Sequence, residues 1–207
     1  MALTAADGAK IRESYSGEKE LSICARHGLT QVGGSRTKVD GENETTKASI
    51  KNASGSSTQV HLTTQAHFIE TMGLNETCAT FVRQFCGSVD MDVNGKDRMT
   101  PAEIDDEVCE EFVNWMNDNK EKVVDLIIRN GFGINLVIYN DIKNDVEYSL
   151  TYDEICDKIK DSSWVLSRGG VHLKSNGKTL FHFQREGKRN PRNRYNTLWH
   201  IHRNLFQ

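Results

Sequence analysis

Residues 36–62 constrain the fold most, because charged side chains occupy places where a short strand normally carries apolar ones. Within this stretch, Ser49 and Lys51 alternate with Ala48 and Ile50, so the two pairs lie on opposite faces of a strand. An inward-facing lysine costs free energy unless its charge is paired. The pattern therefore predicts a lysine held inside the fold by a nearby carboxylate.

Asp40, at the end of the preceding strand-like segment, is the expected partner of Lys51. A third strand-like segment follows a turn of small residues, and Gln59 and His61 share one of its faces. An Asp and a Lys on neighbouring strands most often form a surface ion pair worth less than about 1 kcal/mol. The same pair also suits a metal-dependent phosphodiesterase, in which Asp40 holds a divalent cation and Lys51 orients water or neutralises charge.

The order Asp40, then Ser49-x-Lys51 on the next strand, then the Gln59 strand resembles the PD-(D/E)XK nuclease superfamily, with its restriction-endonuclease-like fold. Serine in the second acid position is similar to a variant found among restriction enzymes. The resemblance implies that Asp40 binds Mg²⁺, Ser49 fills the acid position and Lys51 is the catalytic lysine. It also implies that Gln59 orients the lysine or a phosphate, and that the Ile50 carbonyl is a further Mg²⁺ ligand.

A second carboxylate is needed, because a serine hydroxyl binds Mg²⁺ less strongly than an anionic oxygen. Residues 16–29 read as an amphipathic helix, and nucleases of the family resembled here often carry a glutamate on the helix before the Asp strand. Glu20 is preferred, because it lies beside Cys24 at i, i+4 spacing on the buried edge of that helix. The alternatives are Glu18, Glu42 and Glu44.

The charge of the chain is strongly divided. Residues 164–207 carry nine Lys and Arg against one acid, whereas residues 1–163 carry 17 basic and 28 acidic residues. This division predicts that the C-terminal segment meets a polyanion, and arginine and asparagine there suit phosphate and base-edge contacts. The expected DNA-contacting residues are Arg185, Lys188, Arg189, Arg192, Asn193, Arg194 and Tyr195.

The length of 207 residues predicts one α/β domain over 1–207. We expect a mixed central sheet flanked by helices, with a basic C-terminal β-hairpin extension. The sheet is expected over 36–40, 48–52, 59–62 and 133–139. The domain divides into a catalytic core over about 15–75, a helical insert over about 76–130 and a DNA-contacting tail over about 164–207.

The five cysteines are scattered without a C-x-x-C pair, which indicates free thiols in a reducing compartment. Neither a membrane span nor a signal pattern is present in the sequence, so a cytoplasmic protein is expected.

These observations together predict a Mg²⁺-dependent endodeoxyribonuclease, sequence-specific in the manner of type II restriction enzymes. Its expected substrate is double-stranded DNA, and a homodimer is expected because a two-fold duplex matches two-fold symmetry. One alternative is a non-catalytic DNA- or RNA-binding protein, with Ser49 the relic of a lost acid. A third hypothesis is a zinc site built on His200 and His202.

Overall fold

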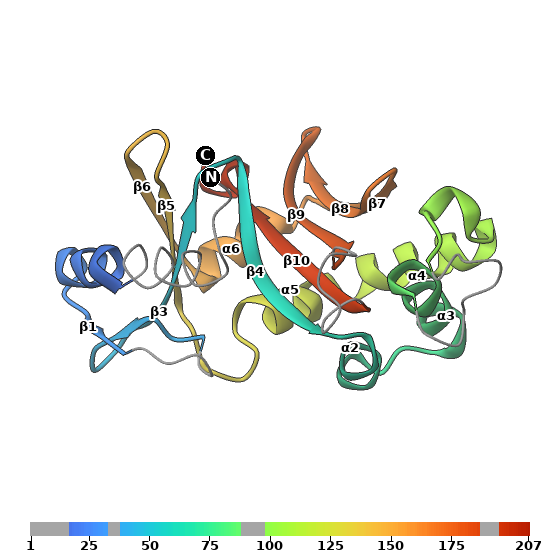
Figure 1. Cartoon of the computed structure of the whole chain (residues 1–207), viewed down its shortest axis with the longest axis horizontal. Helices are drawn as coiled ribbons and strands as arrows, with labels where there is room; N and C mark the ends of the chain where they lie inside the picture. Colours follow the sequence, from blue (N-terminus) through green and yellow to red (C-terminus); the bar gives the residue numbers. More distant parts are fainter. Residues whose placement is uncertain (1–16, 33–37, 88–97, 187–194) are drawn as a thin grey trace, which may run out of the picture.

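Two five-stranded sheets organise the chain, and the turn between β3 and β4 carries it from one sheet to the other (Figure 1). The computed structural model describes residues 17–32, 38–87, 98–186 and 195–207. In sheet order, the first sheet consists of β1 (Thr30–Gln31), β2 (Gly41–Glu42), β3 (Lys47–Ala53), β5 (Leu136–Asp141) and β6 (Val146–Thr151). The second consists of β4 (Ser57–Thr64), β10 (Asn196–His202), β9 (Lys178–Arg185), β8 (Gly170–Ser175) and β7 (Ser163–Ser167).

The first sheet is mixed, as the sequence predicted. The strands β3 and β5 run parallel, which pairs Ser49 with Val137 and Lys51 with Tyr139, while the other neighbours in the sheet are antiparallel. The second sheet is antiparallel throughout. The fold is therefore an α/β arrangement of a mixed sheet flanked by helices.

The helices start where side chains cap their first turns. Thr64 accepts a hydrogen bond from the backbone of His67, and Asn75 accepts one from that of Cys78. Residues 17–26 also form a helix, which lies at the opposite end of the molecule from α3 and α4 (Figure 1). The helices with described bounds are α2 (Gln65–Met72), α3 (Glu76–Cys86), α4 (Asp106–Asp118), α5 (Lys120–Ile128) and α6 (Tyr152–Ile159), with 3₁₀ turns η2 (Pro101–Glu103) and η3 (Arg203–Phe206).

The segment 59–62 was expected in the central sheet, and this prediction was wrong. It lies in β4, which pairs with β10 instead of β3. The reason is non-local, because the backbone groups of β4 find their hydrogen-bond partners on β10, more than 130 residues along the chain. Strand β2 also begins one residue after Asp40, so the aspartate precedes its strand instead of ending one.

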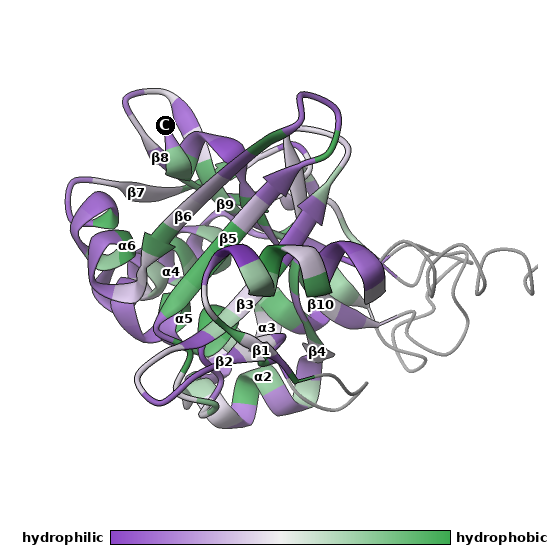
Figure 2. Ribbon diagram, turned by 90° about the vertical axis from the view of Figure 1, so that its left-hand side faces the viewer, coloured by the Kyte–Doolittle hydropathy of each residue, from purple (hydrophilic) through white to green (hydrophobic). Residues whose placement is uncertain are grey.

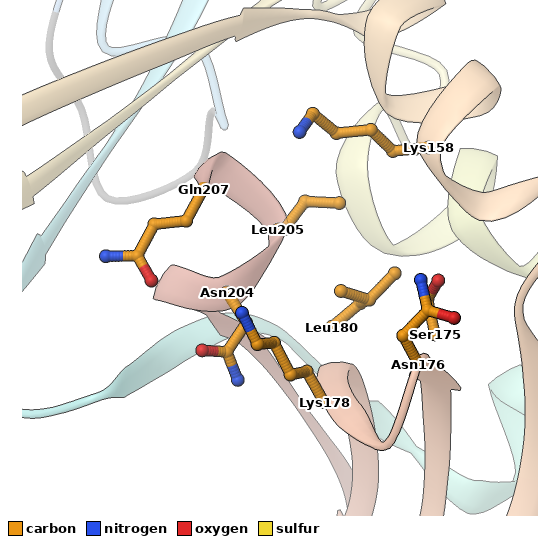
Figure 3. Close-up of a pocket in the computed structure, with 8 residues that line it drawn as sticks. All are labelled: Lys158, Ser175, Asn176, Lys178, Leu180, Asn204, Leu205 and Gln207. Atoms are coloured by element: carbon orange, nitrogen blue, oxygen red, sulfur yellow. The ribbon is translucent and has the colours of Figure 1, made fainter.

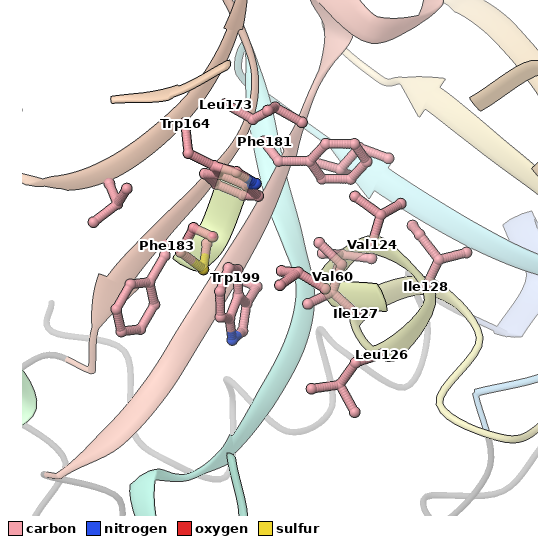
Figure 4. Packing of buried hydrophobic residues seen from close by; sticks show 14 of the residues in the cluster. Val60, Val124, Leu126, Ile127, Ile128, Trp164, Leu173, Phe181, Phe183 and Trp199 are labelled. Carbon is pink, nitrogen blue, oxygen red and sulfur yellow. The ribbon is translucent and has the colours of Figure 1, made fainter. Parts of the chain in front are cut away.

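The C-terminal hairpin β8–β9 is present, with its turn at Asn176 and Gly177, but it is not an appended extension. It forms the middle of the second sheet, and its inner face is part of the main hydrophobic core (Figure 4). Phe181 and Phe183 on β9 are fully buried, and Phe183 stacks on Trp199 at 4.6 Å between ring centroids. Fully buried aromatic pairs of this kind stabilise the sheet beyond their area alone.

Two separate clusters of apolar residues cover the faces of the first sheet. The main core fills the space between its inner face, the second sheet and the helices α2 to α6. The ribbons coloured by hydropathy show apolar residues along the start of β5 (Figure 2). A smaller cluster attaches the N-terminal helix to the other face; it comprises Ile23, Cys24, Leu29, Ala48, Ile50 and Ile138.

All five cysteines are free, as the sequence predicted, and four of them are buried. Within the described ranges, no helix combines the length and apolar character needed to cross a lipid bilayer.

Candidate active site

Backbone contacts from two sides fix Asp40 just before β2. Its N–H donates to the carbonyl of Ala48 at 2.9 Å, and its carbonyl accepts from the N–H of Val32 at 3.1 Å. The Cys24 thiol also lies 3.8 Å from that carbonyl. Asp40 is thus held by the first sheet and the N-terminal helix, although it lies in no strand.

The carboxylate of Asp40 meets three consecutive residues of β3. Its Oδ2 accepts a 2.6 Å hydrogen bond from the N–H of Ile50 and a 3.3 Å bond from the hydroxyl of Ser49. The Nζ of Lys51 lies 3.8 Å from the same oxygen. The structure therefore brings Asp40, Ser49 and Lys51 together.

Lys51 is well shielded from solvent, since only 16% of its side chain is exposed, and 24% of the Asp40 side chain is. Ser49 is buried, and it shares the inner face of β3 with Lys51. A partly buried ion pair of this kind is screened by salt much less than a surface pair. Such a site concentrates charge at one point of an otherwise apolar inner face.

Glu20, on the N-terminal helix, lies within electrostatic range of this site. Burial raises its pKa, and the Asp40 carboxylate raises it further, while Lys51 and a hydrogen bond from Gln31 lower it. The charges of Glu20, Asp40 and Lys51 therefore act on one another directly. Of the alternative acids, Glu18 and Glu44 are exposed and Glu42 lies in β2.

Gln59 does not join this group. The register between β4 and β10 shifts, so that Trp199 is opposite His61 and His200 is opposite Gln59, with Val60 as the extra residue of a β-bulge. Directly opposed residues share a face, so Gln59 is exposed on the outer face beside His200, whereas His61 is buried on the inner face with Trp199. The expectation that Gln59 and His61 share a face was wrong, because a bulge reverses the alternation.

Lys38 lies within electrostatic range of Lys51, although the sequence analysis gave it no role. Its Nζ donates to the carbonyl of Ile127 at 2.7 Å, and its charge interacts with that of Lys51. The feature of the sequence that could have pointed to Lys38 is its position two residues before Asp40. In an extended segment, residues at this spacing place their side chains on the same face.

The predicted DNA-contacting residues are only partly described. The guanidinium of Arg185 donates to the carbonyls of Met99 at 2.8 Å and Phe85 at 3.3 Å, so it anchors β9 to the helical segment. The ring of Tyr195 lies under the guanidinium of Arg98, 5.8 Å from it. The remaining predicted residues lie outside the described ranges: Lys188, Arg189, Arg192, Asn193 and Arg194.

His200 and His202 occupy the outer face of the second sheet together with His182. The Nε2 of His202 lies 2.7 Å from Nδ1 of His182, and the Nε2 of His200 lies 3.2 Å from Nε2 of Gln184. Throughout the described part of the chain, no group of three or more His, Cys, Asp or Glu side chains is arranged to hold a metal ion. The geometry gives the zinc hypothesis no support.

The chemistry of the Asp40 site nevertheless fits Mg²⁺. Hard cations take anionic oxygens, and Mg²⁺ is usually held by one or two carboxylates completed by water and substrate phosphates. Asp40 and Glu20 supply two carboxylates, and their mutual repulsion is the kind that a divalent cation relieves. The Ile50 carbonyl as a further ligand stays a prediction.

A cavity of about 240 Å³ lies elsewhere, between the β8–β9 turn, α6 and η3 (Figure 3). None of the predicted catalytic residues lines it. Its lining residues are Lys158, Ser175, Asn176, Lys178, Leu180, Asn204, Leu205 and Gln207.

The crystal structure of the restriction endonuclease MspI in complex with its cognate DNA has a similar fold. The match has a TM-score of 0.50 and 10% sequence identity, and it covers 94% of this chain and 82% of that one. No protein-family model and no curated protein matches the sequence. At this identity the likeness establishes the fold alone.

Proposed function

We propose that this chain is a Mg²⁺-dependent endodeoxyribonuclease that hydrolyses phosphodiester bonds of double-stranded DNA. The observation that carries the proposal is the ion pair between Asp40 and Lys51, 3.8 Å apart, with the Glu20 carboxylate within electrostatic range of both. The restriction-endonuclease-like fold supports it, because the MspI structure that shares the fold is a DNA complex.

Each residue has a distinct role in the proposed reaction. Asp40 and Glu20 would hold Mg²⁺, which supplies Lewis-acid stabilisation of charge on the phosphoryl oxygens. Lys51 orients the attacking water and places its positive charge beside the scissile phosphate. The hydroxyl of Ser49 and the N–H of Ile50 orient the Asp40 carboxylate, because both donate to its Oδ2.

The proposed enzyme acts in the manner of a sequence-specific type II restriction enzyme. A homodimer would place one site on each strand of a two-fold recognition sequence. The basic segment after residue 186 supplies affinity for the DNA backbone, so binding should weaken steeply as salt is added.

The first test is incubation of plasmid and phage DNA with the protein, with and without Mg²⁺. Discrete bands that require Mg²⁺ would support the sequence-specific enzyme, whereas a smear would support a nuclease without specificity. The Lys51→Ala variant should cut at least about 100-fold more slowly, since it loses a charge that acts in the transition state, yet bind DNA normally in Ca²⁺. Lys47→Ala, an exposed position on the same strand, is the matched control.

The second candidate is a DNA- or RNA-binding protein without catalysis. The observation that favours it is the Ser49 hydroxyl, which donates to Asp40 where a nuclease of this fold would carry a second carboxylate. DNA left intact by the folded protein under all metal conditions, together with tight binding, would select this candidate.

A further inference from the structure

Lys38 connects the segment that carries Asp40 to the end of a helix. Its ammonium donates to the carbonyl of Ile127, in the last turn of α5, at 2.7 Å. Carbonyls at a helix C-terminus lack intrahelical partners and carry partial negative charge, so a lysine is a favourable ligand for them. This bond links the segment before β2 to a helix of the main core.

The amine is also within electrostatic range of a residue on each sheet, Lys51 on β3 and His61 on β4. The Lys38 side chain is only partly exposed, and its charge interacts with that of Lys51. Lys38 in turn contributes to the lowered pKa of His61 on β4, after burial. The His61 ring is 5% exposed, and within the described ranges its Nε2 has no hydrogen-bond partner.

A lysine is an energetically unfavourable residue at this position if its only role is to hold the fold together. Burying an ammonium without a carboxylate is unfavourable, and within the described ranges no carboxylate forms an ion pair with Lys38. A neutral side chain could fill the same space at lower cost. The presence of a lysine is instead explained by its place in the sequence, because its bond to Ile127 fixes the backbone two residues before Asp40.

We propose that Lys38 is a positioning residue for the metal site, where its bond to Ile127 holds the Asp40 carboxylate in place against β3. The inference rests on the proposed nuclease function and deepens it. Asp40 lies in no strand, and its hydrogen bonds to Ala48, Ser49 and Ile50 all come from β3. Lys38 adds a restraint from α5 on the segment that leads into Asp40.

The test compares Lys38→Met with Lys122→Met. Lys122 lies on α5, the helix that Lys38 contacts. Its ammonium donates to the carbonyl of Met72, the last residue of α2, at 2.8 Å. This is the same type of bond, but both of its residues are far from Asp40 in the sequence. Mn²⁺ binding to the DNA-free protein is measured by calorimetry, and DNA cleavage is measured across a Mg²⁺ series. Melting temperatures of both variants report any general loss of stability.

We expect Lys38→Met to weaken Mn²⁺ binding about tenfold and to raise the half-saturating Mg²⁺ concentration equally, as for residues that orient metal ligands. Lys122→Met should leave both unchanged. Lys38→Arg, which keeps a donor for Ile127, should restore most of the Mn²⁺ affinity. Should Lys38→Met unfold at the assay temperature, Mn²⁺ binding is measured in the cold, and Lys38→Arg is compared with it there.

Wild-type Mn²⁺ affinity in the folded Lys38→Met protein would overturn the positioning role while leaving the nuclease intact. A wild-type protein that neither binds Mn²⁺ nor cuts DNA would overturn the proposed function itself, and the inference with it. The two failures are distinguished by the wild-type measurement.

Discussion

The backbone nitrogen of Ile50 lies 2.6 Å from Oδ2 of Asp40, which makes the aspartate a side-chain continuation of the β-ladder. Asp40 occupies no strand of its own, yet its carboxylate is bound to β3 at the residue before Lys51. A charge-assisted hydrogen bond to a backbone N–H is short and orients the carboxylate strongly. The distance between Asp40 and Lys51 therefore follows from the geometry of β3.

Asp40→Asn separates the structural role of this residue from its charge. The Asn oxygen can still accept from Ile50, but Lys51 loses its paired charge, so the melting temperature without metal should fall by about 4 °C, the effect of roughly 1 kcal/mol. The variant loses the anionic oxygen that Mg²⁺ requires, so Mg²⁺ should no longer raise the melting temperature. Thermal unfolding with and without Mg²⁺ measures both effects. A retained Mg²⁺ response would remove Asp40 from the metal site.

Glu20→Gln should stabilise the metal-free protein. Burial and the charge of Asp40 raise the pKa of Glu20, so its ionised form is disfavoured in the folded state at neutral pH. The same substitution should reduce Mg²⁺ binding, because one of two carboxylates is lost. Calorimetric Mg²⁺ titration and thermal unfolding provide the two readouts. Glu18→Gln, on the exposed side of the same helix, is the control, and equal effects from both variants would contradict the assignment.

Gln59→Ala should leave the rate of DNA cleavage within about twofold of wild type. The substitution removes no interaction with the transition state, and only such a loss lowers the rate of the chemical step. Gln59 is exposed on the outer face of the second sheet, opposite His200. Steady-state cleavage rates at saturating Mg²⁺ test this directly. A loss of the size expected for Lys51→Ala would mean that Gln59 reaches the site after all.

Mild acid should destabilise the second sheet through its histidines. Burial first, and then neighbouring imidazoles, lower the pKa of His200 and His202 to about 4, and that of His182 is also lowered by burial. In the unfolded chain these groups titrate near 6.5, so the unfolded state binds more protons as the pH falls between about 6.5 and 4. The contribution to stability is thus complete above pH 6.5 and is lost toward pH 4.

Melting temperatures between pH 7 and pH 4.5 measure this loss, which should reach at least about 3 °C. Carboxylates also titrate in part of this range, so the double variant His200→Gln, His202→Gln is the control. Its melting temperature should fall less steeply with pH than that of the wild type. Identical slopes would show that other groups cause the acid sensitivity.

The alternating pattern of residues 48–51 was enough to predict that Ser49 and Lys51 face inward, because strand periodicity is a local property. Asp40 as partner of Lys51 also followed from the sequence, because adjacent strands in a hairpin-like order are adjacent in space. The free cysteines were equally a local signal. Sequence alone thus predicted the mixed sheet and the pair at its centre.

Only the tertiary structure decided what surrounds that pair. The bulge at Val60 depends on the pairing of β4 with β10, more than 130 residues away, and it moves Gln59 out and His61 in. The bond from Lys38 to Ile127 and the approach of Glu20 to Asp40 likewise join separate elements. Such contacts come from the packing of faces against one another, and no local periodicity encodes them.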